Sequence, residues 1–177
     1  DMSYEDFEWL MGINFWGVVH GTKAFLPHLK AAGDGHIVNV SSVFGLIGVP
    51  TQSAYNAAKF AVRGFTEALR QELEMEGGRV SCTSVHPGGI KTNIARNARM
   101  GAGVEKITGD VDKARRDFEK MFRTTPEEAS QTILKGVKGN KRRVLIGSDA
   151  RAIDSMQRLM PTAYQRIMVA GQKMMRK

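Results

Sequence analysis

Apolar residues recur at helical spacing along two long segments of the chain, residues 3–31 and residues 52–76. In the first segment the apolar positions are Phe7, Leu10, Met11, Phe15, Val18, Val19, Phe25, Leu26 and Leu29. Positions spaced in this way lie on one face of a helix. The second segment ends at Gly77–Gly78, as expected for a helix terminus. The same pattern predicts further helices over residues 111–122, over residues 126–138 and in two pieces separated by Pro161.

Between these helical segments lie three short runs that are apolar and rich in β-branched residues. They are residues 36–42 (HIVNVSS), 79–89 (RVSCTSVHPGG) and 142–148 (RRVLIGS). Such runs are typical of buried strands. Because the strands alternate with helices, the pattern predicts an α/β domain built on a parallel sheet.

The composition is that of an ordinary globular protein, with 42% hydrophobic and 25% charged residues in a chain of 177. No apolar run approaches the ~20 residues that a membrane-spanning helix needs. The single cysteine, Cys82, cannot form an internal disulfide, and the four histidines show no spacing typical of a metal site. These features favour a cytoplasmic protein without a metal centre.

The net charge of +8 is concentrated near the carboxyl end. From Gly139 to Lys177 there are nine Lys/Arg and two acidic residues, which gives +7. We therefore separate residues 149–177 as a basic, Met-rich amphipathic helical tail. Such a tail can contact a membrane surface, and helix packing or a subunit contact is the alternative. Nucleic-acid binding ranks last because the chain shows no aromatic stacking platform or known module.

Two polar side chains stand four positions apart near the start of the second long helix. Tyr55 and Lys59 share one helix face and are therefore predicted neighbours. A nearby ammonium favours the phenolate, so we expect Lys59 to lower the pKa of Tyr55. Ser42 ends a predicted parallel strand, and open α/β sheets bind ligands beyond the carboxyl ends of their strands. The three residues suit interconversion of a carbonyl and an alcohol, with Tyr55 as general acid/base.

A Tyr-x-x-x-Lys pair by itself also occurs on helices by chance. Here the motifs INFWG, IVNVSS, SAYNAAK and VHPGGIKT follow one another in order, and Ser42 stands thirteen residues before Tyr55. This combination resembles the classical short-chain dehydrogenase/reductase family. The resemblance implies a Rossmann-type doubly wound parallel sheet, NAD or NADP as cofactor, and an alcohol or carbonyl substrate. It covers residues 1–148, which would form the carboxyl-terminal, catalytic portion of that fold.

The resemblance also implies roles for four residues. Tyr55 would be the acid/base, and Lys59 would lower its pKa and bind the nicotinamide ribose. Ser42 would position the substrate carbonyl. Asn14 would hold a water molecule that links Lys59 to solvent.

Two further groups of residues follow from the resemblance. Besides Tyr55 and Lys59, the cofactor contacts would be Pro87, Gly88, Ile90 and Thr92. The substrate pocket would be lined by Val43, Phe44, Val49 and His86. Their apolar character favours a lipophilic substrate, and core packing of several of them is the alternative.

The sequence departs from the family pattern at its start. Family members open with a Gly-rich phosphate-binding turn, and no such turn occurs in these 177 residues. We therefore expect the sequence to be the carboxyl-terminal part of a longer protein, preceded by on the order of 100 residues of strands and helices. A non-catalytic relative that serves as a binding or assembly partner is the alternative. In the family the helices over residues 3–31 and 52–76 commonly pair two or four subunits, so a homodimer or homotetramer is expected.

Overall fold

The computed structural model describes residues 2–94, 96–98 and 109–175 of the chain. In chain order the elements are α1 (Tyr4–Met11), the π-helical turn η1 (Gly12–Trp16), α2 (Gly17–Ala32), β1 (Gly35–Val40), the 3₁₀ turn η2 (Val43–Gly45), α3 (Ser53–Met75), β2 (Val80–Pro87), α5 (Val111–Lys120), α6 (Pro126–Lys138), β3 (Arg143–Ile146), α7 (Ser148–Leu159) and α8 (Tyr164–Met175). Strands and helices thus alternate, as the hydrophobic pattern predicts.

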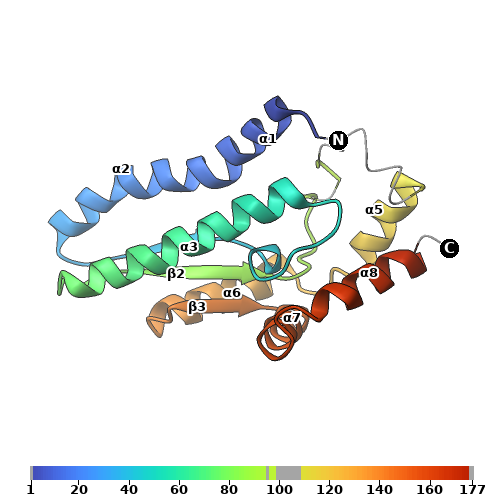
Figure 1. Ribbon diagram of the computed structural model, residues 1–177. Helices are drawn as coiled ribbons and strands as arrows, with labels where there is room; N and C mark the ends of the chain where they lie inside the picture. The colour runs from blue at the N-terminus through green and yellow to red at the C-terminus, as the bar shows by residue number, and fades with distance from the viewer. Residues whose placement is uncertain (1, 95, 99–108, 176–177) are drawn as a thin grey trace.

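The three strands form one parallel sheet in the order β1-β2-β3. Gly35 lies opposite Val80, and Ser84 lies opposite Arg143. Helices α2 and α3 cover one face of the sheet, and α6 packs on the other face (Figure 1). The expected α/β fold with a parallel sheet and helices on both faces is therefore confirmed.

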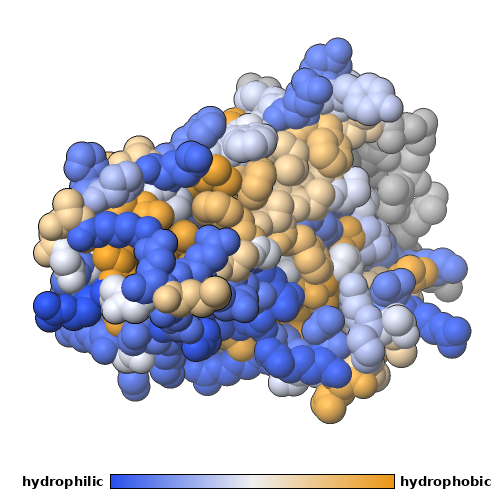
Figure 2. Space-filling view, turned by 60° about the vertical axis from the view of Figure 1, so that its left-hand side comes forward, coloured by the Kyte–Doolittle hydropathy of each residue, from blue (hydrophilic) through white to orange (hydrophobic). Residues whose placement is uncertain are grey.

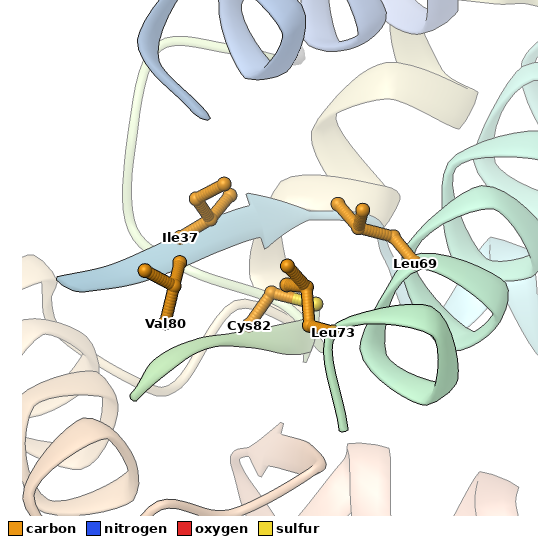
Figure 3. Close-up of a cluster of buried hydrophobic side chains, with 5 residues drawn as sticks. All are labelled: Ile37, Leu69, Leu73, Val80 and Cys82. Atoms are coloured by element: carbon orange, nitrogen blue, oxygen red, sulfur yellow. The ribbon is translucent and has the colours of Figure 1, made fainter. Parts of the chain in front are cut away.

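Each face of the sheet has its own hydrophobic core. On the α3 side, Ile37, Leu69, Leu73, Val80 and Cys82 pack together, with strand side chains pointing toward those of α3 (Figure 3). On the α6 side the buried cluster consists of Val85, Ala129, Val144 and Ile146. The strands have apolar residues on both faces because both faces are covered by helices.

The first long helix begins and continues much as the sequence pattern predicts. Ser3 caps it, because its hydroxyl accepts a hydrogen bond of 3.1 Å from the amide of Asp6. The helical run then extends from Tyr4 to Ala32, with the π turn η1 in its middle. The apolar spacing gives no sign of this turn, since a single extra residue in one turn hardly disturbs the periodicity.

The strands are shorter than their apolar runs. β1 ends at Val40 because Ser42 leaves the sheet and caps η2, its hydroxyl accepting a 3.1 Å hydrogen bond from the amide of Phe44. β2 ends at Pro87, which has no amide hydrogen to donate to a neighbouring strand. The two serines of the first predicted strand therefore lie just beyond its carboxyl end.

The carboxyl-terminal helices α7 and α8 pack on the rest of the molecule. Ala150 is completely buried, and the hydroxyl of Tyr164 accepts a 3.0 Å hydrogen bond from the amide of Gly48. The division into residues 1–148 and a tail of residues 149–177 stays a prediction, although the contact of Tyr164 with Gly48 joins the two parts. Every helix in the described ranges is too short or too polar to cross a bilayer.

Candidate active site

Three of the four expected catalytic residues lie close together at the carboxyl ends of β1 and β2. Ser42 follows β1, and Tyr55 and Lys59 lie in the first two turns of α3. The Ser41 hydroxyl donates a 2.7 Å hydrogen bond to the carbonyl of Lys59, which ties the end of β1 to α3. A side chain at Gly45 would collide with Ser41 and with the Lys59 backbone, so only glycine lets η2 pack this closely. The local packing thus places Ser42 beside the two α3 residues.

The Tyr55 ring is half-buried and lies edge-on to Phe44, with the ring centroids 5.9 Å apart. Burial raises the pKa of the Tyr55 phenol, and a hydrogen bond with the Ser42 side chain partly offsets that increase. The phenol is therefore protonated at neutral pH and is coupled to Ser42.

Lys59 is buried, and its ammonium donates a 3.2 Å hydrogen bond to the carbonyl of Val40. Its Nζ lies 5.5 Å from the centroid of the Tyr55 ring. Burial also lowers the pKa of Lys59. Burial and the Ser42 hydrogen bond are the main influences on the pKa of Tyr55, while the Lys59 ammonium lies over the Tyr55 ring and bonds to the backbone. The expectation that Lys59 lowers this pKa stays a prediction.

Asn56, next to Tyr55 in the sequence, organises the loop that follows Ser42. Its amide group donates 2.7 Å hydrogen bonds to the carbonyls of Phe44 and Ile47, and its carbonyl accepts a 3.0 Å bond from the amide of Val49. Three backbone groups of the loop are thus bound by one side chain. Sequence reasoning missed Asn56 because nothing in the SAYNAAK segment shows which way its side chain points.

The four predicted pocket residues divide into two pairs. Phe44 and Val49 are half-buried, with Phe44 against the Tyr55 ring, and both remain candidates for contact with a substrate. Val43 is 6% exposed and His86 is 0% exposed. The prediction that His86 lines a pocket is wrong, because its side chain is completely buried and forms hydrogen bonds inside the core. Val43 is largely buried, and its contact with a substrate stays a prediction.

His86 lies on β2 with its ring nitrogens between two polar groups. Nδ1 is 3.0 Å from the carbonyl oxygen of Ser42, and Nε2 is 2.9 Å from the hydroxyl of Ser84. Burial lowers the pKa of His86 to about 4, against a smaller rise from the hydrogen bond with Ser42. The imidazole is therefore neutral at physiological pH.

The segment expected to face the cofactor leaves the end of β2 as a backbone held from several sides. The amide of Gly88 donates a 2.9 Å hydrogen bond to the carbonyl of Ile146, and Ile90 pairs with Thr124 in an isolated parallel bridge. Thr92 is exposed. These contacts bring Pro87, Gly88, Ile90 and Thr92 to the same edge of the sheet as Ser42.

Asp149, in the first turn of α7, binds the backbone of the same segment. Its carboxylate accepts a 2.6 Å hydrogen bond from the amide of Gly89. A side chain at Gly88 would collide with the same carboxylate, which explains the glycine. Sequence reasoning missed Asp149, although one signal was present: Asp149 follows the third strand, and the carboxyl ends of parallel strands share one edge.

Asn14 lies in η1, which packs against α3. Its amide group donates a 3.3 Å hydrogen bond to the carbonyl of Leu10. π-Helical turns are frequent at functional sites because they reorient side chains within a helix. The role of Asn14 in a proton relay stays a prediction.

No group of three His, Cys, Asp or Glu side chains in the described part of the chain could hold a metal ion. The donors at the sheet edge are instead a phenol, hydroxyls, an ammonium and backbone amides. This set can bind a polar oxygen and transfer a proton to it.

Comparison with known proteins gives one consistent result. A family model described as short chain dehydrogenase matches residues 1–103. SadH of Mycobacterium tuberculosis, whose name describes an oxidoreductase, is 54% identical over 169 residues, which are 96% of this chain and 60% of SadH. The chain thus spans about three fifths of the length of that relative.

Two solved structures are similar to the chain. A short chain dehydrogenase/reductase from Burkholderia phymatum in complex with NAD has a TM-score of 0.77 at 25% identity, over 89% of this chain and 59% of its own. A short chain dehydrogenase from Burkholderia cenocepacia in complex with NADP has a TM-score of 0.73 at 25% identity, over 94% and 60% of the two chains.

Proposed function

Because the chain belongs to the short-chain dehydrogenase family, we propose that it carries the catalytic half of an oxidoreductase that interconverts an alcohol and a ketone or aldehyde with NAD(H) or NADP(H). The observation that carries this proposal is the junction of Ser42, Tyr55 and Lys59 at one edge of the sheet.

Tyr55 is the proton donor in the direction of carbonyl reduction. Its raised pKa keeps the phenol protonated at neutral pH. The proton passes from its hydroxyl to the substrate oxygen as that oxygen gains charge, and it returns along the same path in alcohol oxidation. Ser42, coupled to Tyr55 through its side chain, donates a second hydrogen bond to the same oxygen.

Lys59 supports Tyr55 from beside the ring. An ammonium has three N–H donors, and the Val40 carbonyl accepts one hydrogen bond from it. The remaining donors suit the hydroxyl groups of a ribose. The positive charge also stabilises Tyr55 when the phenol has given up its proton.

The residues at this edge fit the nicotinamide end of a cofactor. Lys59 offers donors to the ribose, and the Ile90 backbone and the Thr92 side chain offer polar groups to the carboxamide. When bound, the cofactor supplies or accepts the hydride. The related structures named above contain NAD in one case and NADP in the other, and we propose no preference between them.

The substrate is proposed to be lipophilic. Phe44 packs against Tyr55, and Val49 follows it on the same loop, which Asn56 holds in place. Apolar side chains beside the proton donor favour a carbonyl compound with a hydrocarbon substituent over a charged one.

The assembly is proposed to be a homodimer or homotetramer. Several large apolar side chains on the first long helix are exposed: Trp9, Ile13, Trp16 and Phe25. Figure 2 shows a broad area of hydrophobic surface on one face of the molecule. Exposed apolar surface of this kind commonly marks a contact with another protein surface.

We propose a cytoplasmic protein, and contact of the tail with a membrane surface is a second proposal. On α8 the exposed side chains include Arg166 and Lys173 together with Ile167 and Val169. Cations beside apolar groups suit an anionic lipid surface. Co-sedimentation with anionic liposomes that persists unchanged after deletion of residues 150–177 would argue against this contact.

The alternative is a non-catalytic relative that acts as a binding or assembly partner. A turnover assay of the full-length protein separates the two, using NADH and NADPH with a series of ketones of increasing hydrocarbon length. We expect turnover with one of the cofactors and its loss in Tyr55→Phe, with cofactor binding retained. Absence of both turnover and cofactor binding in the unaltered protein would favour the alternative.

A further inference from the structure

A series of hydrogen-bonded polar groups leads from the core to the backbone of Ser42. It runs from the Ser84 hydroxyl through the His86 ring to the Ser42 carbonyl, with distances of 2.9 Å and 3.0 Å. Ser84 and His86 are both 0% exposed. Buried polar groups of this kind form specific hydrogen bonds because an unpaired one is costly.

The partners of the ring determine its tautomer. A carbonyl oxygen only accepts hydrogen bonds, so Nδ1 of His86 carries the hydrogen that it donates to Ser42. The ring is neutral because burial lowers its pKa to about 4, so Nε2 is an acceptor and the Ser84 hydroxyl donates to it. Each hydrogen bond from Ser84 through His86 to Ser42 then has a defined donor and a defined acceptor.

The Ser42 backbone is held at several points. Its carbonyl oxygen accepts hydrogen bonds from His86 and, at 3.0 Å, from the amide of Gly45. The neighbouring Ser41 amide donates a 2.8 Å hydrogen bond to the carbonyl of Val85. The Ser42 side chain accepts a bond from Phe44 at the start of η2. Among these contacts only the one from His86 binds the Ser42 peptide group through a side chain, so a substitution can remove it.

We propose that His86 is a positioning residue for Ser42. Its Nδ1–H fixes the orientation of the Ser42 peptide group and thereby the direction of the Ser42 hydroxyl toward the substrate oxygen and Tyr55. The expected effect on turnover rests on the proposed function. The hydrogen bond from His86 to Ser42 does not depend on it. A histidine that merely fills the core would have no need of a particular nitrogen at a particular place.

Two amide side chains make a matched pair for the test. The amide nitrogen of asparagine stands as many bonds from Cβ as Nδ1 of histidine, and that of glutamine as many as Nε2. His86→Asn therefore retains a donor to Ser42, whereas His86→Gln retains a polar group and loses that donor.

The kinetic measurement uses the native full-length protein. We expect kcat of His86→Gln to fall by roughly 10–100-fold, since a small misplacement of a reacting group has effects of that size. His86→Asn should stay within about threefold of the unaltered protein, and the cofactor Kd should not change in either variant. Equal kcat values in the two variants would overturn the proposal. If His86→Gln fails to fold, His86→Leu, which also lacks the donor, replaces it.

A second measurement does not depend on turnover. Long-range ¹H–¹⁵N correlation spectra at neutral pH should show His86 as the neutral ring protonated at Nδ1, and the ¹³C shift of the Ser42 carbonyl should move in His86→Gln but not in His86→Asn. A ring protonated at Nε2 would overturn the proposal. If the unaltered protein shows the Nδ1–H ring but no turnover with either cofactor, the proposed function fails while the positioning of Ser42 stands on the carbonyl shift.

Discussion

Toward the amino ends of β1 and β2, the side chains between the sheet and α3 are mainly hydrocarbon, as in the cluster of Ile37, Leu69, Leu73 and Val80 (Figure 3). Toward the carboxyl ends of the same strands the buried side chains are polar. They include Asn39, Ser41, Lys59, Ser84 and His86. One sheet and one helix thus contain an apolar region and a polar region that differ in how they are held together.

The polar region depends on directed hydrogen bonds. Asn39 accepts a 3.4 Å bond from Thr22 and donates a 3.1 Å bond to Thr66, so even the groups behind the site are paired. Apolar contacts are non-directional and depend mainly on buried area, whereas a hydrogen bond requires particular atoms in particular places. We infer that the apolar region mainly determines stability and that the polar region determines the geometry of the proposed active site.

The sharpest test of this contrast is Tyr55→Phe. Phenylalanine keeps the ring that packs on Phe44 and loses only the hydroxyl, so the fold should persist. We expect kcat to fall by roughly 10²–10⁴-fold, the usual contribution of a general acid/base. Steady-state kinetics of the full-length protein measure this, with the thermal unfolding midpoint as the control. A variant with more than a tenth of the original kcat would contradict the assignment.

Leu73→Ala probes the apolar region. Leu73 is 2% exposed, and removing its side chain leaves a cavity, so the free energy of unfolding should fall by about 2–5 kcal/mol. Urea denaturation measures the loss. Met75→Ala is the matched control, because Met75 lies on the same helix and is 88% exposed. Activity below the denaturation range should change little, and a large loss of kcat in Leu73→Ala would break the division between the two regions.

Asp149→Ala tests whether the polar region extends to α7. It removes the acceptor for the Gly89 amide, a hydrogen bond to a charged group that is typically worth about 1.5–3 kcal/mol. We expect the cofactor Kd to rise by about tenfold or more as the Gly88–Gly89 turn loosens. Asp149→Asn keeps an acceptor and should lie close to the unaltered protein. Titration of the full-length protein with NADH and NADPH provides the values, and an unchanged Kd in Asp149→Ala would limit its role to packing.

The smallest expected effect is a pH dependence of stability. His86 has a pKa of about 4 in the folded chain against an ordinary value of 6.5. The unfolded chain therefore binds this proton first as the pH falls, so stability is complete above 6.5 and declines as the pH drops toward 4. Between pH 7.5 and 5.5 we expect a loss of about 1 kcal/mol from this group. Urea denaturation at the two pH values measures it, and His86→Asn should lack that component. An equal decline in both proteins would assign it to other groups.

Local sequence features predicted that Ser42, Tyr55 and Lys59 lie close together. The four-residue spacing of Tyr55 and Lys59 requires only a helix, and Ser42 requires only that a strand end before it. Both elements follow from hydrophobic periodicity, which reflects burial of one or two faces. The position of Ser42 beside Tyr55 then follows from the parallel order of strands.

Other features of the site could not be read in this way. His86 looked like a pocket residue because the sequence does not show that its side chain points into the core. Asn56 binds three loop backbone groups, and a single amide residue in a helix carries no sign of such a role. The pKa of Tyr55 depends on burial by residues from several elements, which the spacing to Lys59 alone does not show.

The sequence by itself determined the order of helices and strands, the family and the identity of Ser42, Tyr55 and Lys59 as the expected catalytic group, since each depends on residues close together in the chain. Only the tertiary structure decided how this group is supported. The contact from Asp149 to Gly89 spans 60 residues, and that from Tyr164 to Gly48 spans 116. Such contacts arise because the strand order brings distant loops to one edge of the sheet, and no local pattern carries that information.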